Sequence, residues 1–293
     1  MSYENLPVLF AYDIDNTVRP GDEYPPAKRE QGWRGLEELG RALRTEKLRR
    51  SQAGQPRFYS GPATGRLMVS LEAQARQEPQ LARIVLAESD LTITGVGTQL
   101  GWRSQPDAPL TPDADWPPPN PLWRPEKIRA YLNGQPHMAT QEAEAQDFAK
   151  ISYILHGLAE TATGDYAAAL TAELQHRGWP AQVIVSDQAG LTFCDVLPPG
   201  IDKGAPYAFA RDCIAREHDG LAPLTIFGGD SMNDCGAARR ADLVLLPLNA
   251  EPAFREWARD PKEMNGVLFE AQRNFAYGLL DGLVEHGVVR IPA

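Results

Sequence analysis

The stretch that decides the fold is LPVLFAYDIDNT, residues 6–17. Its first part, Leu6 to Tyr12, is a short and nearly continuous apolar run, which is typical of a strand buried on both faces of a parallel sheet. Asp13 and Asp15 follow this run directly. Because open α/β sheets bind ligands at the carboxyl ends of their strands, the stretch predicts an α/β core with a site at the end of this strand.

The same alternation of strand and helix patterns recurs on both sides of the chain. Apolar strand patterns and helical periodicity predict one doubly wound parallel sheet, interrupted in the middle of the chain. The loop over residues 19–33 is longer than usual after a strand, so we expect it to reach over a site. The expected strands are 56–60, 91–96, 224–227 and 241–246 (the last one), and the expected helices are 34–50, 67–75, 206–216, 233–239 and 269–286.

A proline-rich segment marks the expected domain boundary. Eight prolines stand between residues 106 and 125, where they exclude regular helix and central strand and predict a stiff, extended connection. Behind it, strand patterns at 150–155, 182–186 and 191–197 and a helix at 166–176 predict an antiparallel α+β unit. We therefore expect a core of residues 1–110 and 200–293 and an inserted α+β cap domain of residues 111–199.

Composition limits the partners. The chain has 293 residues and a formal net charge of −10, so its surface repels phosphate backbones and anionic membranes, and we expect neither nucleic acid nor a membrane as partner. Three cysteines without C-x-x-C spacing are typical of a reducing compartment. Without a secretory signal or an apolar run of about 18 residues, we expect a cytoplasmic protein. The oligomeric state is left open.

Polar residues follow the expected strands in a pattern that suits phosphoryl transfer. Asp13 and Asp15 share a face of an extended chain, so one can attack while the other handles a proton. A hydroxyl at Ser60 and the ammonium of Lys203 can hold a phosphoryl group. Carboxylates, with more in GGDSMND at residues 228–234, are the ligands that Mg²⁺ prefers. The set predicts a small phosphorylated substrate and Mg²⁺ as the cofactor.

Each piece also has a structural interpretation when it is taken alone. Two aspartates two residues apart are frequent in turns and helix caps. Asp230, taken alone, is typical of a helix N-cap, and Lys203, taken alone, is typical of a solvent-exposed surface lysine. An EF-hand loop is excluded, because Val18 and Tyr24 stand where it requires Gly and Glu. The order of the whole set after successive strands favours chemistry.

YDIDNTV (12–18), GGDSMND (228–234) and Lys203 in PGIDKG resemble the motifs of the haloacid dehalogenase superfamily. TGVGTQL (94–100), KISYIL (150–155) and FCDVLPPGIDKG (193–204) resemble, in the same order, its sucrose-phosphate phosphatase-like branch with a type C2b cap. The resemblance covers nearly the whole chain. It implies a Rossmann-like core with an inserted cap.

The resemblance also implies roles for individual residues. Asp13 would be the nucleophile that becomes an aspartyl-phosphate, and Asp15 the general acid and base. Mg²⁺ would be held by Asp13, the backbone carbonyl of Asp15 and Asp230, with Asp234 and Asn233 anchoring its waters and Lys203. The residues that would bind substrate are Thr64, Arg66, Gly97, Thr98, Lys150, Ser152, Asp195 and Asn233.

One motif departs from the family pattern, which has T-G-R directly after the second strand. Here the chain reads FYSGPATGR over residues 58–66. Either Ser60 or Thr64 supplies the hydroxyl, and Ser60 is favoured because it stands where the strand is expected to stop. Arg66 then contacts substrate or faces solvent.

The sequence thus predicts a Mg²⁺-dependent phosphomonoesterase acting on a sugar phosphate or a similar small metabolite. Two alternatives remain, a sugar phosphomutase built on the same motifs and a non-catalytic sugar-phosphate-binding protein. The sequence does not name the substrate.

Overall fold

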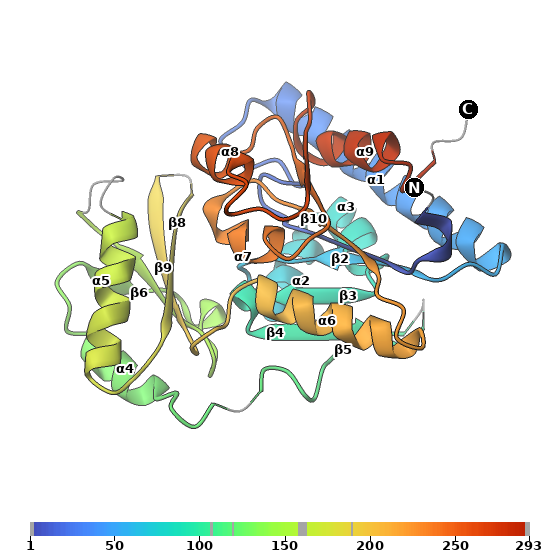
Figure 1. Cartoon of the computed structure of the whole chain (residues 1–293). Coiled ribbons are helices and arrows are strands. Elements are labelled where there is room, and N and C mark those ends of the chain that lie inside the picture. Colours follow the sequence, from blue (N-terminus) through green and yellow to red (C-terminus); the bar gives the residue numbers. More distant parts are fainter. Residues whose placement is uncertain (1–2, 106–107, 119, 158–162, 189, 291–293) are drawn as a thin grey trace.

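The computed structural model describes residues 3–105, 108–118, 120–157, 163–188 and 190–290. A five-stranded parallel sheet in the order β12-β11-β10-β1-β2 forms the centre of the core (Figure 1). The apolar run that opens the chain is β1, which lies between β2 and β10 and is buried throughout. The five strands are β1 (Val8–Tyr12), β2 (Phe58–Pro62), β10 (Leu224–Gly228), β11 (Leu243–Leu246) and β12 (Val267–Glu270).

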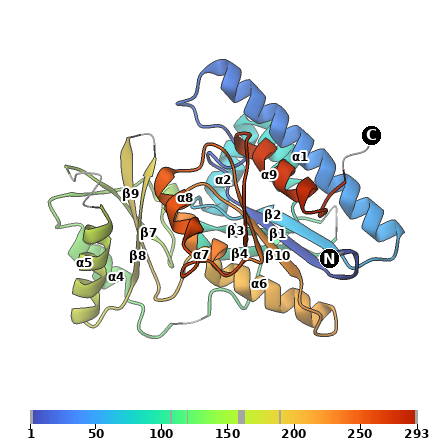
Figure 2. The ribbon, with the colours of Figure 1, turned by 45° about the horizontal axis from the view of Figure 1, so that its top comes forward.

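Helices cover both faces of this sheet, as a doubly wound fold requires. One face packs against α1 and α9, which lie side by side in Figure 2, and includes Phe10 of β1. The other face includes Leu9 and packs against α6, α7 and α8. The helices are α1 (Pro26–Gln52), α6 (Gly204–Glu217), α7 (Cys235–Ala238), α8 (Pro252–Arg259) and α9 (Phe275–Glu285).

A second core sheet, antiparallel, lies beside β2. Backbone hydrogen bonds from Thr64 N to Ile93 O and from Asp90 N to Ser60 O, both 2.8 Å, join the end of β2 to β3. β5 lies within the proline-rich segment and forms the edge of this sheet, and an edge strand tolerates proline. The core sheet therefore extends to Pro112. The elements here are α2 (Met68–Gln77), α3 (Pro79–Leu81), η2 (Ala82–Leu86), β3 (Leu91–Thr94), β4 (Gln99–Arg103) and β5 (Leu110–Pro112).

The inserted segment folds as a separate layer with its own core. Its antiparallel sheet has the order β6-β7-β9-β8, and α4 and α5 cover the face that points away from the core (Figure 1). Of the expected proline connection, Pro106 and Pro119 lie outside the described residues. The elements are α4 (Pro125–Leu132), β6 (Met138–Thr140), β7 (Ile151–Leu155), α5 (Thr163–His176), β8 (Gln182–Gln188) and β9 (Leu191–Leu197).

Two expectations about the core were wrong. The first helix begins at Pro26 rather than near residue 34, because proline suits the first helical turn; the long loop is therefore shorter than expected. The strand at 241–246 (β11) is not the last one, because a further strand, β12, follows it, and Phe269 and Glu270 of β12 were expected to begin the C-terminal helix. This strand is short and lies half-buried at the sheet edge, so its apolar pattern is weak. Among the described residues, no helix is both long and apolar enough to cross a membrane.

Candidate active site

The polar ends of the core strands meet in one buried cluster. Asp13 follows β1, Lys203 stands at the start of α6, and Asp234 lies in the loop after β10. Lys203 Nζ is 2.7 Å from each of three oxygens, Asp13 Oδ1, Asn233 Oδ1 and Asp234 Oδ1. Segments about 190 positions apart in sequence are therefore joined by one ammonium group, as the motifs predicted.

The loop after β10 is held by its own side chains. Asp234 Oδ2 accepts hydrogen bonds from the backbone N–H groups of Asp230 (3.0 Å) and Ser231 (3.3 Å). Thr17 Oγ1 donates to Asp230 Oδ1 over 2.5 Å, which ties this loop to the one after β1. Since both oxygens of Asp234 are bonded in this way, it serves to fix the loop and Lys203.

The electrostatics of the cluster are those of an acidic site short of positive charge. Burial raises the pKa of Asp13 to about 7, against the opposing effect of Lys203. Burial and the neighbouring Asp13 and Asp234 carboxylates raise the pKa of Asp230 well above its usual range. Burial alone would lower the pKa of Lys203, but the Asp13 and Asp234 carboxylates outweigh it and raise that pKa.

These residues fit a divalent cation. Carboxylate oxygens of Asp13, Asp230 and Asp234 lie within 4.8 Å of one another, and all three residues are buried. The ammonium of Lys203 pairs with the Asp13 and Asp234 carboxylates, and Asp230 accepts from the Thr17 hydroxyl, so three carboxylates meet one ammonium at the cluster. Hard oxygen donors with uncompensated charge are the ligand set that Mg²⁺ takes.

The register of the parallel sheet shows which of the two candidate hydroxyls, Ser60 or Thr64, lies near the level of Asp13. Ser60 pairs with Phe10, and Pro62 pairs with Tyr12, so Ser60 lies three residues before the level of Asp13. Its backbone N–H binds Asp90 Oδ2 instead. The expectation that favoured Ser60 is not supported, because β2 continues to Pro62 and the strand ends later than its sequence suggested. Thr64 stands beyond that end.

A cavity of about 270 Å³ opens above the cluster, between the core and the inserted domain. It brings together most of the residues predicted to bind substrate, and it also has lining residues that the motifs did not indicate. The predicted lining residues are Asp13, Asp15, Thr64, Arg66, Lys150, Asp195, Asp230 and Asn233; the others include Gln141, Glu142, Ser186 and Glu251. The latter belong to loops and strand faces without a recognisable motif.

The cap contributes a buried charged triplet. Lys150 Nζ lies 2.7 Å from Asp195 Oδ1 and 2.5 Å from Ser152 Oγ, and Ser152 Oγ donates to Asp195 Oδ1 over 2.6 Å. Ser152 and Asp195 face each other across β7 and β9. Lys150 and Asp195 line the cavity, whereas Ser152 is not among its lining residues.

Like Ser152, the predicted substrate-binding residues Gly97 and Thr98 lie outside the cavity wall. Gly97 O accepts a hydrogen bond from Trp116 Nε1 (2.9 Å), and Thr98 Oγ1 donates to Gly95 O (2.9 Å). The turn over Gly95–Gly97 (η3) packs against the backbone before Lys203, since a Cβ added at Gly97 would lie 2.1 Å from Asp202 O. Gly97 and Thr98 therefore lie behind the cavity wall, and the residue of this turn that lines the cavity is Val96.

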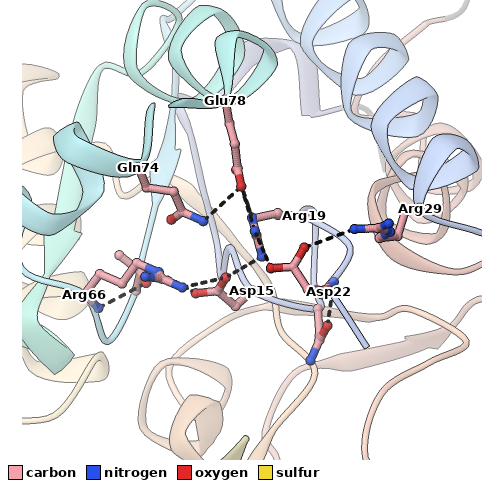
Figure 3. A network of polar contacts seen from close by, with 10 residues as sticks. Asp15, Arg19, Asp22, Arg29, Arg66, Gln74 and Glu78 are labelled. Atoms are coloured by element: carbon pink, nitrogen blue, oxygen red, sulfur yellow. Dashed lines mark hydrogen bonds and ion pairs between the residues drawn. The ribbon is translucent and has the colours of Figure 1, made fainter. Parts of the chain in front are cut away.

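Asp15 lies between two guanidinium groups (Figure 3). Arg66 Nε donates to Asp15 Oδ2 (2.7 Å) and Arg66 Nη2 to Asp15 Oδ1 (3.1 Å). On the other side Arg19 Nη1 lies 3.4 Å from Asp15 Oδ1. The sequence left open whether Arg66 contacts substrate or faces solvent; the structure places it in the cavity wall, paired with Asp15.

Known proteins share this architecture. A sucrose-phosphatase from Synechocystis sp. PCC6803, solved in complex with sucrose and phosphate, is 25% identical with a TM-score of 0.68, and the match covers 97% of this chain and 99% of that one. A haloacid dehalogenase-like hydrolase from Bacillus subtilis, 15% identical, shares the fold with a TM-score of 0.56 over 96% and 92% of the two chains. Among curated protein sequences, none matches the chain.

The family model of sucrose-6F-phosphate phosphohydrolase matches residues 6–287, which is nearly the whole chain and includes the core motifs and the cap. The protein therefore belongs to the sucrose-6F-phosphate phosphohydrolase family and is a phosphatase of the haloacid dehalogenase superfamily.

Proposed function

We propose that this protein is a Mg²⁺-dependent phosphatase that hydrolyses a sugar phosphate through an aspartyl-phosphate on Asp13, with a phosphate ester of sucrose as the first candidate substrate. The observation that carries the proposal is the buried cluster in which Lys203 joins Asp13 to Asp234, next to a cavity that residues of both the core and the cap line. The family and the Synechocystis phosphatase with its bound sucrose and phosphate support the substrate class.

The proposed reaction has two steps on the residues of this chain. A carboxylate oxygen of Asp13 attacks phosphorus, the bond to the sugar oxygen breaks, and Asp15 gives that oxygen a proton. Asp15 then takes a proton from water, which attacks the aspartyl-phosphate and releases inorganic phosphate. Lys203 and Thr64 bind the phosphoryl oxygens as charge develops on them.

The metal would be held by Asp13, Asp230 and the backbone carbonyl of Asp15. When bound, Mg²⁺ neutralises charge on the carboxylate and the phosphate, which would otherwise repel each other. The cap residues Lys150 and Asp195 face the same cavity and are placed to bind the sugar. Closure of the cap over the cavity would exclude bulk water during attack.

The test is phosphate release by the purified protein across a panel of sugar phosphates, with Mg²⁺ and after its removal by a chelator. We expect release from at least one sugar phosphate, abolished by the chelator and restored by added Mg²⁺. The Asp13→Asn variant should lose about 10⁴-fold or more in kcat, because the nucleophile is gone. Asp212→Asn is the matched control, since the Asp212 side chain is 55% exposed on α6 and pairs there with Arg211.

Undiminished phosphate release by Asp13→Asn would contradict the aspartyl-phosphate. Formation of an isomerised sugar phosphate without free phosphate would indicate a phosphomutase instead. Calorimetric binding of a sugar phosphate without turnover would indicate a binding protein.

A further inference from the structure

Arg19 is a buried arginine with no role in the proposed chemistry so far. It lies in the loop after β1 and is only 7% exposed. A buried guanidinium costs several kcal/mol unless its donors are paired, so its partners indicate why it is there. The loop itself places it, because Arg19 N donates to Ile14 O and Arg19 O accepts from Asn16 N, both over 2.8 Å.

Glu78 fixes the side chain of Arg19 from the far end of α2. Arg19 Nε lies 2.9 Å and 3.1 Å from the two Glu78 carboxylate oxygens, and Arg19 Nη2 lies 2.6 Å from Glu78 Oε1. Such a two-pronged pair holds the plane of the guanidinium as well as its charge. The remaining nitrogen, Nη1, points at Asp15 Oδ1 (Figure 3).

The two arginines at Asp15 differ in what else holds them. Arg66 lines the cavity, its side chain is 35% exposed, and it pairs with Asp15, so an anionic substrate entering the cavity competes with Asp15 for it. Arg19 has an 8% exposed side chain and is clamped by Glu78. Arg19 therefore stays beside Asp15 whether the cavity is filled or empty.

We infer that Arg19, fixed by Glu78, is a positioning residue that holds the Asp15 carboxylate at the leaving-group end of the cavity. The inference rests on the proposed function, because it gives Asp15 the proton transfers of the two steps. Arg19 is not itself a lining residue of the cavity, and it reaches the cavity wall at Asp15. Its effect on turnover would therefore pass through Asp15.

The test compares two leaving groups in single-turnover reactions with the enzyme in excess, where release of the leaving group reports only the first step. One substrate is the sugar phosphate that the wild-type protein hydrolyses fastest, whose sugar oxygen needs a proton as it departs. The other is p-nitrophenyl phosphate, whose phenolate leaves without one. Misplacing Asp15 slows the first reaction selectively, whereas damage to the phosphate site slows both.

We expect Arg19→Gln to slow sugar release about 10- to 100-fold, within the range of general acid catalysis, and to leave p-nitrophenol release unchanged. Glu78→Gln should show the same pattern more weakly. Arg19→Lys should fall between, since an ammonium cannot span Glu78 and Asp15 with fork geometry. Arg83→Gln is the control, because the 61% exposed Arg83 side chain pairs with Glu37, outside the network around Asp15.

Because Arg19→Gln leaves Glu78 without its partner and can impair folding, the double variant Arg19→Gln/Glu78→Gln is measured beside it; the same selective loss is expected there. Equal slowing of both leaving groups, or no slowing of either, overturns the inference while the proposed function stands. Failure of the wild-type protein to release either leaving group overturns the proposed function and this inference with it.

Discussion

At the scale of single residues, the hydroxyl of Thr64, just beyond the end of β2, should have a measurable effect on kcat. Thr64 lines the cavity with Asp13, whereas Ser60 lies within the strand, three residues before the level of Asp13. We expect Thr64→Ala to lower kcat about 10²-fold, as loss of one donor to developing phosphoryl charge does. Ser60→Ala should leave kcat unchanged. Steady-state phosphate release from the two variants distinguishes them, and the reverse order would restore Ser60 to the site.

Asp13 and Asp230 were predictable from local sequence, because each follows an apolar strand of the core and parallel strands end at one edge of a sheet. Lys203 comes after β9, a strand of the antiparallel cap sheet, so its place beside Asp13 was predicted from its motif and not from that rule. Ser60 was misplaced because the strand pattern around Gly61 and Pro62 does not show where pairing stops. The position of Arg19 beside Asp15 could not be predicted from the sequence, because its partner Glu78 comes from another part of the chain.

At the scale of elements, the turn before β4 supports the active site through a glycine. Gly97 has φ +95°, and a Cβ there would lie 2.1 Å from Asp202 O and 3.2 Å from Lys203 N. We expect Gly97→Ala to lower the free energy of unfolding by more than the 1–2 kcal/mol or so that a left-handed residue costs, because the backbone before Lys203 must also shift. Urea denaturation measures the loss, and kcat should fall with it.

Gly178→Ala is the matched control for that variant. Gly178 has φ +72°, but no heavy atom lies within 4 Å of its added Cβ. It should therefore show the backbone cost alone and keep full activity. Equal losses of stability in the two variants would mean that the contact with Asp202 is relaxed at no cost.

Elements with strong internal periodicity were predicted well, and elements that depend on tertiary contacts were not. β9 has the predicted bounds, 191–197, because both of its ends carry turn signals. α1 begins earlier than its leucine pattern, since Pro26 starts it and its first turns make few core contacts. β12 forms only because β11 offers it an edge, which its own four residues cannot show.

At the scale of the whole molecule, the cavity takes one wall from each domain, so the domains should affect different kinetic constants. Lys150 is a cap residue 4% exposed at the cavity, paired with Asp195. We expect Lys150→Met to raise KM for the sugar phosphate about 10- to 100-fold, the value of one charged hydrogen bond. KM for p-nitrophenyl phosphate, which has no sugar, should not change.

Lys127→Met is the control for general effects on the cap, because Lys127 is exposed on α4. An equal rise in KM for both substrates would show that Lys150 acts on the phosphate or on cap folding.

The doubly wound core and the inserted α+β layer were both predicted. Their boundary was not sharp in the sequence, because β5 still pairs with core strand β4 inside the proline-rich segment.

The central place of β1 also determines which of the two sheets can be completed first while the protein is being synthesised. Its two neighbours are β2, reached by residue 62, and β10, which begins at residue 224. The cap sheet, by contrast, is complete once residue 197 has emerged from the ribosome. During translation the cap sheet can thus be completed before the core sheet, and β1 keeps one edge unpaired until Gly228, the last residue of β10, has been synthesised.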